Sequence, residues 1–117
     1  MPLLKLETTA AIPEDKRKGL LSSLSKILAG TTGKPEEYVM VTASQAAMVM
    51  AGRPGDAAFV DIRSIGALNA DVNKMLSQQV CRIITNSVGI SSERIYLNFT
   101  DVQADNWGWN GSTFGSA

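Results

Sequence analysis

The feature that most constrains the fold is an internal repeat, in which a strand pattern, a helix pattern and a second strand pattern occur twice. In the first half, residues 3–8 have the alternation of a strand, and a helix is expected to start at Pro13. The second half has a strand pattern over 58–63, a helix capped by Asn69, and a strand pattern over 95–100. Each half suits a βαβ unit, whose parallel strands are joined by a right-handed crossover.

Glycines are expected to end both helices, Gly30 and Gly33 the first and Gly89 the second. The segment 38–43 (YVMVTA) is rich in β-forming residues, so it predicts the strand that closes the first unit. The stretch 46–51 fits either one turn of helix or an extension of that strand, and a Gly-Arg-Pro-Gly turn follows it.

Two such units predict an α/β (α+β) fold, a four-stranded mixed sheet with both helices on one face. The length of 117 residues suits a single domain spanning 1–117, and a chain this small would gain from burying surface in an oligomer. The face without helices would carry polar side chains such as Asp61, Arg63, Tyr96 and Asn98. These suit an interface better than a dry core, so another subunit is expected to cover them.

Composition excludes several kinds of chemistry and of partner. The 11 basic and 11 acidic residues form no basic stripe, so no nucleic-acid partner is expected. One cysteine and no histidine exclude an intrachain disulfide, a Cys/His zinc site and a His-dependent triad. No apolar run is long enough to span a membrane, and the first residues lack the pattern of a signal peptide, so the cytoplasm is the expected compartment.

Five short motifs carry a specific resemblance because they occur in order and at matching spacing. They are Met1-Pro2, Thr32-Gly33-Lys34-Pro35, Ser64-Ile65-Gly66, Ile95-Tyr96-Leu97-Asn98, and Gly108-Trp109-Asn110 with Ser112-Thr113-Phe114. Together they resemble the macrophage migration inhibitory factor and D-dopachrome tautomerase family of the tautomerase superfamily. The resemblance extends over essentially the whole chain.

This resemblance implies a homotrimer of the repeated βαβ fold, with active sites between subunits. It implies keto–enol tautomerisation of phenylpyruvate-like α-keto acids and of dopachrome-like analogues. The expected ligand is thus a small aromatic α-keto acid, and neither a cofactor nor a metal is expected.

The residues themselves explain how such a catalyst could work. Once Met1 is removed, Pro2 would carry a free secondary amine, which must lose its proton readily to act as a base at neutral pH. Burial and a nearby cation both lower the pKa of an amine. Lys34 would supply the cation, while Leu3, Ile65 and the aromatic residues near the C-terminus would supply apolar walls.

The resemblance assigns a role to each candidate residue. Pro2 would be the catalytic base, and Lys34 would bind the substrate carboxylate with help from the backbone N–H of Ile65. Tyr96 and Asn98 of the adjacent subunit would contact the aromatic end of the substrate. The pocket would be lined by Leu3, Tyr38, Trp107, Trp109 and Phe114.

Each residue also has a plainer interpretation when taken alone. Pro2 would only permit removal of Met1, and Lys34 would be a surface lysine in a turn. Tyr96 and Asn98 would belong to a sheet surface, and the aromatic residues would serve packing. The ordered combination of motifs favours a site.

The chain also departs from the mammalian pattern. Ala57 and Val60 replace a Cys-x-x-Cys pair, so a thiol oxidoreductase activity is not expected. Arg63 replaces a histidine, and Trp107 replaces a smaller apolar residue near the pocket. This bulkier wall would either narrow the choice of substrate or weaken the activity. A cytokine-like ligand on the same trimeric scaffold, released without a signal peptide and with incidental tautomerase activity, is the alternative function. Receptor-binding residues cannot be read from short motifs.

Overall fold

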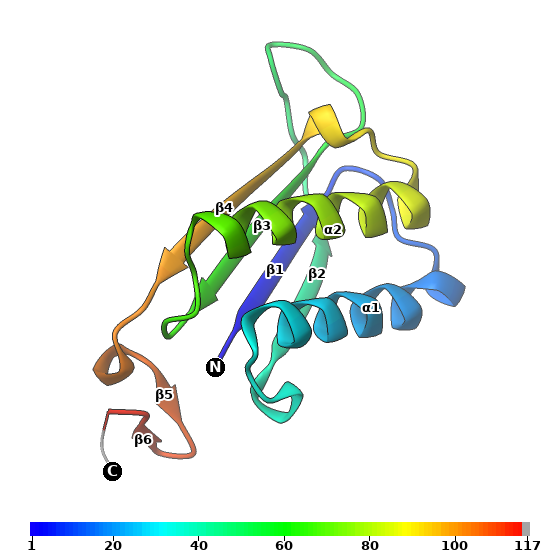
Figure 1. Cartoon of the computed structure of the whole chain (residues 1–117). Coiled ribbons are helices and arrows are strands. Elements are labelled where there is room, and N and C mark those ends of the chain that lie inside the picture. The colour runs from blue at the N-terminus through cyan, green and yellow to red at the C-terminus, as the bar shows by residue number, and fades with distance from the viewer. Residues whose placement is uncertain (116–117) are drawn as a thin grey trace.

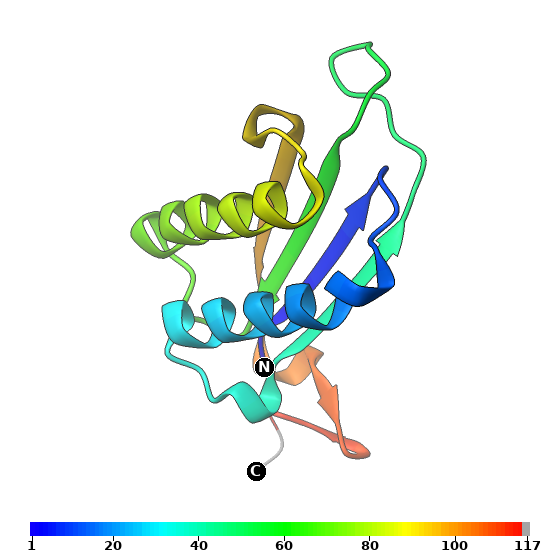
Figure 2. The ribbon, with the colours of Figure 1, turned by 90° about the vertical axis from the view of Figure 1, so that its right-hand side faces the viewer.

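A computed structural model describes residues 1–115 of the chain as two layers, a sheet and a pair of helices on one of its faces (Figure 1). The long elements are β1 (Leu3–Thr8), α1 (Glu14–Thr32), β2 (Met40–Gln45), β3 (Ala58–Ser64), α2 (Ala70–Val88) and β4 (Ile95–Asp101). The short ones are the 3-10 helices η1 (Glu36–Tyr38), η2 (Ser92–Arg94) and η3 (Ala104–Asn106), and the hairpin of β5 (Gly108–Trp109) and β6 (Ser112–Thr113). The N-terminus and this hairpin lie at the same end of the sheet (Figure 2).

The two βαβ units meet along the central strands of the sheet, whose order is β2-β1-β3-β4. β1 is parallel to β2, and β3 is parallel to β4, whereas β1 and β3 are antiparallel. Each parallel pair is therefore bridged by one helix, as parallel strands require a crossover connection. The predicted four-stranded mixed sheet with both helices on one face is confirmed.

The hydrophobic core lies between the sheet and the helices. Alternate residues of the central strands point into it, and Leu4, Leu6, Val60 and Ile62 are fully buried. The helices cover them with Leu20, Leu24, Leu28, Leu76, Val80 and Ile84. Burying one such side chain contributes about 1.5–3 kcal/mol. No helix within residues 1–115 has the length and the apolar character that a membrane span requires.

The ends of the two helices show which of the predicted capping residues determine where each helix starts and stops. The Asn69 side chain caps α2 as predicted, since its Oδ1 accepts a hydrogen bond of 2.9 Å from the backbone N–H of Val72. Gly33 and Gly89 end the helices in the left-handed conformation, with φ of 71° and 73°. The expectation that Gly30 helps to end the first helix is wrong, because α1 continues through this residue to Thr32.

The strand that closes the first unit differs from its predicted range of 38–43. It begins at Met40, because the chain after Pro35 first forms the 3-10 turn η1, and it continues to Gln45. The stretch 46–51 is neither a turn of helix nor a strand. A single backbone hydrogen bond from Ala46 to Thr8 continues the pairing, and an irregular loop follows.

One side chain organises the loop between β2 and β3, which projects beyond the sheet (Figure 1). The guanidinium group of Arg94 donates hydrogen bonds to the carbonyl oxygens of Met50, Arg53, Gly55 and Asp56, at 2.9–3.4 Å. A planar group with five N–H donors is suited to several acceptors at once. Arg94 therefore fixes a segment that has little regular backbone pairing of its own.

The second face of the sheet carries no helix of the described chain (Figure 2). Strand register places on it the alternate residues Leu3, Lys5, Glu7, Met40, Thr42, Ser44, Phe59, Asp61, Arg63, Tyr96, Asn98 and Thr100. Most are polar, and Met40 and Tyr96 are 62% and 67% exposed. This open face is the surface that the sequence predicted for self-association.

The contrast between Gly30 and Gly33 gives a stability test. An added Cβ would contact nothing within 4 Å at either position, so only the backbone differs. Gly30→Ala should stabilise the fold by about 0.5–1 kcal/mol, because alanine is favoured inside a helix. Gly33→Ala should destabilise it by about 1–2 kcal/mol, because the left-handed conformation disfavours a Cβ. Urea unfolding at one protein concentration measures both, and shifts of the same sign would contradict the assignment.

Candidate functional site

The N-terminal segment is fixed at the start of a central strand. Pro2 immediately precedes β1, and its side chain is fully buried. Its carbonyl oxygen accepts a hydrogen bond of 3.1 Å from the backbone N–H of Met40, the first residue of β2. The position of Pro2 is thus set by the same pairing that holds the sheet together.

The amino group at the chain start lies close enough to Lys34 for the two charges to interact. Partial burial, and to a smaller extent the positive charge of Lys34, lower the pKa of the Met1 amino group below its ordinary value. Lys34 directly follows the left-handed Gly33, and its backbone N–H lies 3.4 Å from Oγ1 of Thr32. The end of α1 therefore brings a cation to the start of β1.

While Met1 is present, the nitrogen of Pro2 is an amide nitrogen and has no basic lone pair. The basic amine then belongs to Met1. Removing Met1 would transfer the free amine to Pro2, whose backbone is already held beside β2. The environment that lowers the pKa of the amine would still include Lys34 and the buried start of β1.

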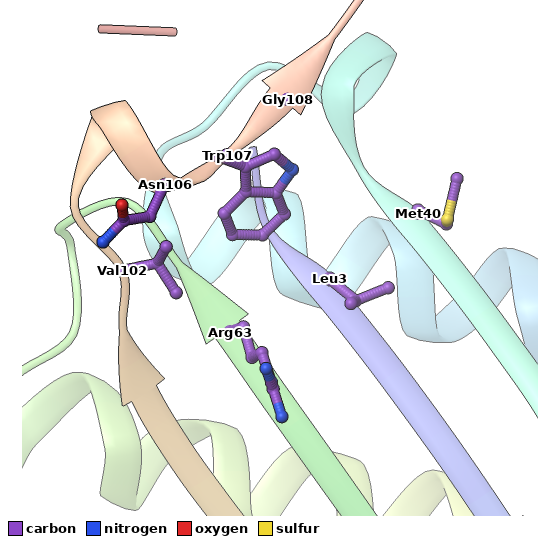
Figure 3. Close-up of a pocket in the computed structure, with 7 residues that line it drawn as sticks. All are labelled: Leu3, Met40, Arg63, Val102, Asn106, Trp107 and Gly108. Carbon is purple, nitrogen blue, oxygen red and sulfur yellow. The ribbon is translucent and has the colours of Figure 1, made fainter. Parts of the chain in front are cut away.

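A pocket of about 340 Å³ opens beside the start of β1 (Figure 3). It is lined by Leu3, Met40, Arg63, Val102, Asn106, Trp107 and Gly108. Figure 3 shows the Trp107 indole between Leu3 and the side chains of Val102 and Asn106, and Arg63 extending away from the indole along the sheet. Two predicted wall residues, Leu3 and Trp107, are thus brought to one cavity.

Sequence reasoning did not assign Met40, Val102 or Asn106 to this pocket. Met40 enters it because β2 pairs with β1 in the register that places Met40 beside Leu3. Val102 follows β4, and its backbone N–H donates to the carbonyl oxygen of Ser64 at 2.9 Å. Strand register places Met40, and the path of the chain after β4 places Val102 and Asn106; no motif in the sequence encodes either.

Three other predicted pocket residues form an aromatic cluster. The ring of Tyr38 makes edge contacts with Trp109 and Phe114, at centroid distances of 5.5 and 6.0 Å. The rings of Trp109 and Phe114 are stacked at 5.6 Å with an interplanar angle of 10°. Such contacts hold the β5–β6 hairpin against η1. The backbone N–H of Phe114 also donates to the carbonyl oxygen of Trp107 at 3.1 Å, so the cluster supports the pocket wall.

Ile65 lies at the turn that follows β3. The next two residues, Gly66 and Ala67, have positive φ angles of 71° and 66°. The backbone N–H of Gly66 donates to Oδ1 of Asp101 at 2.8 Å, which joins the turn to the end of β4. The turn is therefore held in one shape, and the role of Ile65 in binding a carboxylate stays a prediction.

Tyr96 and Asn98 are not brought to the start of their own β1. They lie exposed on the open face, in register with Phe59 and Asp61, whereas the row of Leu3 continues to Thr100. Four residues along a strand separate Tyr96 from that row, or roughly 13 Å. Within one chain the Tyr96 side chain is thus remote from the start of β1, and the supply of Tyr96 and Asn98 by a neighbouring subunit stays a prediction.

The remaining chemistry-bearing groups are few. Among residues 1–115, no group of three or more His, Cys, Asp and Glu side chains is placed to hold a metal ion. Cys81 is a free thiol buried on α2, and this burial raises its pKa above the ordinary value, although a hydrogen bond with Ser92 acts in the opposite direction. A thiol with a raised pKa is a weak nucleophile at neutral pH.

Comparison with known sequences gives matches over nearly the whole chain. A sequence model of the family described as macrophage migration inhibitory factor (MIF) matches residues 1–115. Macrophage migration inhibitory factor of Meriones unguiculatus is 36% identical over 118 residues, which cover 97% of this chain and 99% of the relative. That of Xenopus tropicalis is 41% identical over 96 residues, which cover 81% of this chain and 84% of the relative.

Comparison with solved structures agrees. The macrophage migration inhibitory factor homologue from Prochlorococcus marinus superposes with a TM-score of 0.92 at 39% identity, covering 97% of this chain and 99% of the other. Pt0534, whose structure was solved after inactivation by 2-oxo-3-pentynoate, has a TM-score of 0.87 at 18% identity and covers 97% of each chain. The latter likeness concerns the fold alone.

The lowered pKa of the N-terminal amine predicts a measurable effect of Lys34. Lys34→Gln should raise this pKa, but not fully to its usual value of about 8, because burial is the larger cause and remains. The pH dependence of dinitrophenylation at the N-terminus, followed by mass spectrometry, measures it. Lys26→Gln, which removes an exposed cation of α1, the helix that precedes Lys34, is the control and should leave the pKa unchanged.

The lowered pKa of the N-terminal amine also determines in which direction the free energy of unfolding changes with pH. Between the lowered pKa and about 8, the unfolded chain binds more protons at its terminus than the folded chain does, so this group makes stability rise with pH through that window. Lys34→Gln should make that rise smaller. An unchanged N-terminal pKa in Lys34→Gln would show that the two charges do not interact.

Proposed function

The chain belongs to the macrophage migration inhibitory factor family, and we propose that it is a keto–enol tautomerase of phenylpyruvate-like α-keto acids, with Pro2 as its general base once Met1 is removed. The observation that carries this proposal is that the amine at the chain start, which belongs to Met1 before processing, is partly buried beside Lys34 and has a lowered pKa. A base tuned near the working pH contributes about 10²–10⁴-fold to the rate.

The reaction needs only the movement of a proton between the carbon beside the keto group and the carbonyl oxygen. The neutral amine of Pro2 would take a proton from the carbon beside the keto group. The electron pair of that C–H bond would form a carbon–carbon double bond, while the π pair of the carbonyl group moves to its oxygen. Protonation of the resulting enolate gives the enol, and the reverse sequence gives the ketone. Lys34 would bind the carboxylate of the substrate and stabilise the negative charge of the enolate.

The pocket suits the body of such a substrate. Its volume of about 340 Å³ lies at the small end of the range for ligand sites. Leu3, Val102 and Trp107 offer apolar contact area, and Trp107 can also stack on an aromatic ring. The small volume favours small substrates.

The active unit would be a homotrimer in which a neighbour supplies Tyr96 and Asn98. Support comes from the open sheet face, where both side chains are exposed and Tyr96 is remote from the start of β1 of its own chain. An exposed sheet face is ordinarily buried against another layer. In the trimer these two side chains would complete the wall at the aromatic end of the substrate.

Replacing Pro2 tests the base directly. Pro2→Gly with Met1 removed should reduce ketonisation of phenylenolpyruvate by about 10²–10⁴-fold, because a base and its fixed position are lost. Enol disappearance by ultraviolet absorbance measures the rate, and sedimentation checks that the assembly is retained. Wild-type protein that keeps Met1, as shown by intact mass, should be equally slow. Equal turnover by Pro2→Gly would exclude Pro2 as the base.

A covalent probe gives a second test that does not depend on turnover. The acetylenic keto acid 2-oxo-3-pentynoate carries an electrophilic carbon that a neutral amine can attack. It should add once to the processed chain, at the peptide that begins with Pro2, and prior incubation with phenylpyruvate should slow the addition. Addition elsewhere in the chain, or none, would contradict the proposed amine.

A cytokine-like ligand is the second candidate function. It is favoured by relatives named macrophage migration inhibitory factor that match over nearly the full chain. Receptor recognition would use the outer surface of the assembly and would not need the amine of Pro2. Binding to a macrophage surface that is unchanged in Pro2→Gly would support it, and absence of saturable binding would oppose it.

A further inference from the structure

Arg63 is the charged side chain of an otherwise largely apolar pocket. It is the cross-strand partner of Leu3 in the antiparallel pairing of β1 and β3, so it lies beside the residue that follows Pro2. Its side chain is 51% exposed, and it lines the same cavity as Leu3 and Trp107. A cation is therefore present at the pocket but is not used by the proposed proton transfer.

The ion pair that Arg63 makes leaves it available to a ligand. Its Nε and Nη2 atoms lie 3.2–3.5 Å from the carboxylate of Asp61, two residues away on the same strand. Such exposed pairs contribute little stability, since solvent screens them. Among the described residues, Nη1 has no hydrogen-bond partner. The guanidinium group can thus turn from Asp61 to a ligand anion at small cost.

The two cations approach the start of β1 from different elements. Lys34 comes from the end of α1 and affects the N-terminal amine, whereas Arg63 comes from β3 and extends over the open face. Figure 3 shows Trp107 at one end of the pocket and the Arg63 guanidinium at the other, with Leu3 alongside. Because Leu3 directly follows Pro2 and pairs with Arg63, a ligand whose keto acid lies at the amine and whose body lies against Leu3 would bring its far end to Arg63.

We propose that Arg63 forms a second anion subsite, so that the preferred substrates are α-keto acids with a second carboxylate at the end remote from the keto acid. This inference rests on the proposed tautomerase, because it assumes that the keto acid is bound by Lys34 near Pro2. An apolar or aromatic body would lie against Leu3 and Trp107, and the distal carboxylate would receive the N–H groups of Arg63. Guanidinium groups bind carboxylates through paired hydrogen bonds.

Binding of stable analogues tests the subsite without any reaction. In calorimetric titrations of the processed protein, 4-carboxycinnamate should bind about tenfold more tightly than cinnamate, which lacks only the distal carboxylate. Arg63→Gln should abolish this preference and leave the affinity for cinnamate unchanged. Lys5→Gln is the matched control, because it removes a cation of the same open face that does not line the pocket, and it should keep the preference.

Asp61→Asn should enlarge the preference, because it frees Arg63 from its partner. The subsite would be refuted if wild-type protein bound both compounds equally, or if Arg63→Gln kept the preference. Loss of the preference in Lys5→Gln would also refute the subsite, since the overall positive charge of the open face, and not Arg63 itself, would then attract the distal carboxylate.

A kinetic arm separates this inference from the proposed function. The enol of 4-carboxyphenylpyruvate should show a KM about tenfold below that of phenylenolpyruvate, with similar kcat, and Arg63→Gln should remove the difference in KM. If neither enol is turned over while the binding preference holds, the tautomerase proposal fails and the subsite stands. If both are turned over with equal KM and equal affinity of the analogues, the subsite fails and the tautomerase stands.

Discussion

The antiparallel pairing of β1 with β3 is the interaction on which the rest of the structure depends. It joins two βαβ units that could not each bury their own apolar face, and it places Leu4, Leu6, Val60 and Ile62 at the centre of the core. The same pairing sets Leu3 opposite Arg63 and so forms the floor of the pocket. Architecture and site therefore share one set of backbone hydrogen bonds.

Much of the fold could be predicted from the sequence because its local signals agree with its tertiary packing. The range of β1 and the capping of α2 by Asn69 follow from alternation and from side-chain chemistry, and the structure confirms both. The prediction for Gly30 is wrong because a glycine permits a helix end without requiring one, and here α1 continues two residues further to Thr32. The loop after Gln45 could not be predicted, since Arg94, distant in sequence, determines its shape.

The candidate site was less predictable than the fold. Motifs identified Pro2 and Lys34, and the structure places the N-terminal amine within the electrostatic influence of Lys34. The neighbours Met40, Val102 and Asn106 depend on register and on the path of the chain after β4, which no motif encodes. Tyr96 and Asn98 belong to a surface whose use depends on another subunit, so one chain cannot show their role.

The clamp made by Arg94 has a consequence for motion. Arg94, the last residue of η2, donates to four carbonyl groups of this loop, whereas the backbone bonds within the loop join only Met50 and Arg53. Much of the order of the loop therefore depends on one guanidinium group. Such a segment opens as one cooperative unit, at a free energy below that of global unfolding. Its amide protons would then exchange with solvent together, while those of β1 and β3 remain protected.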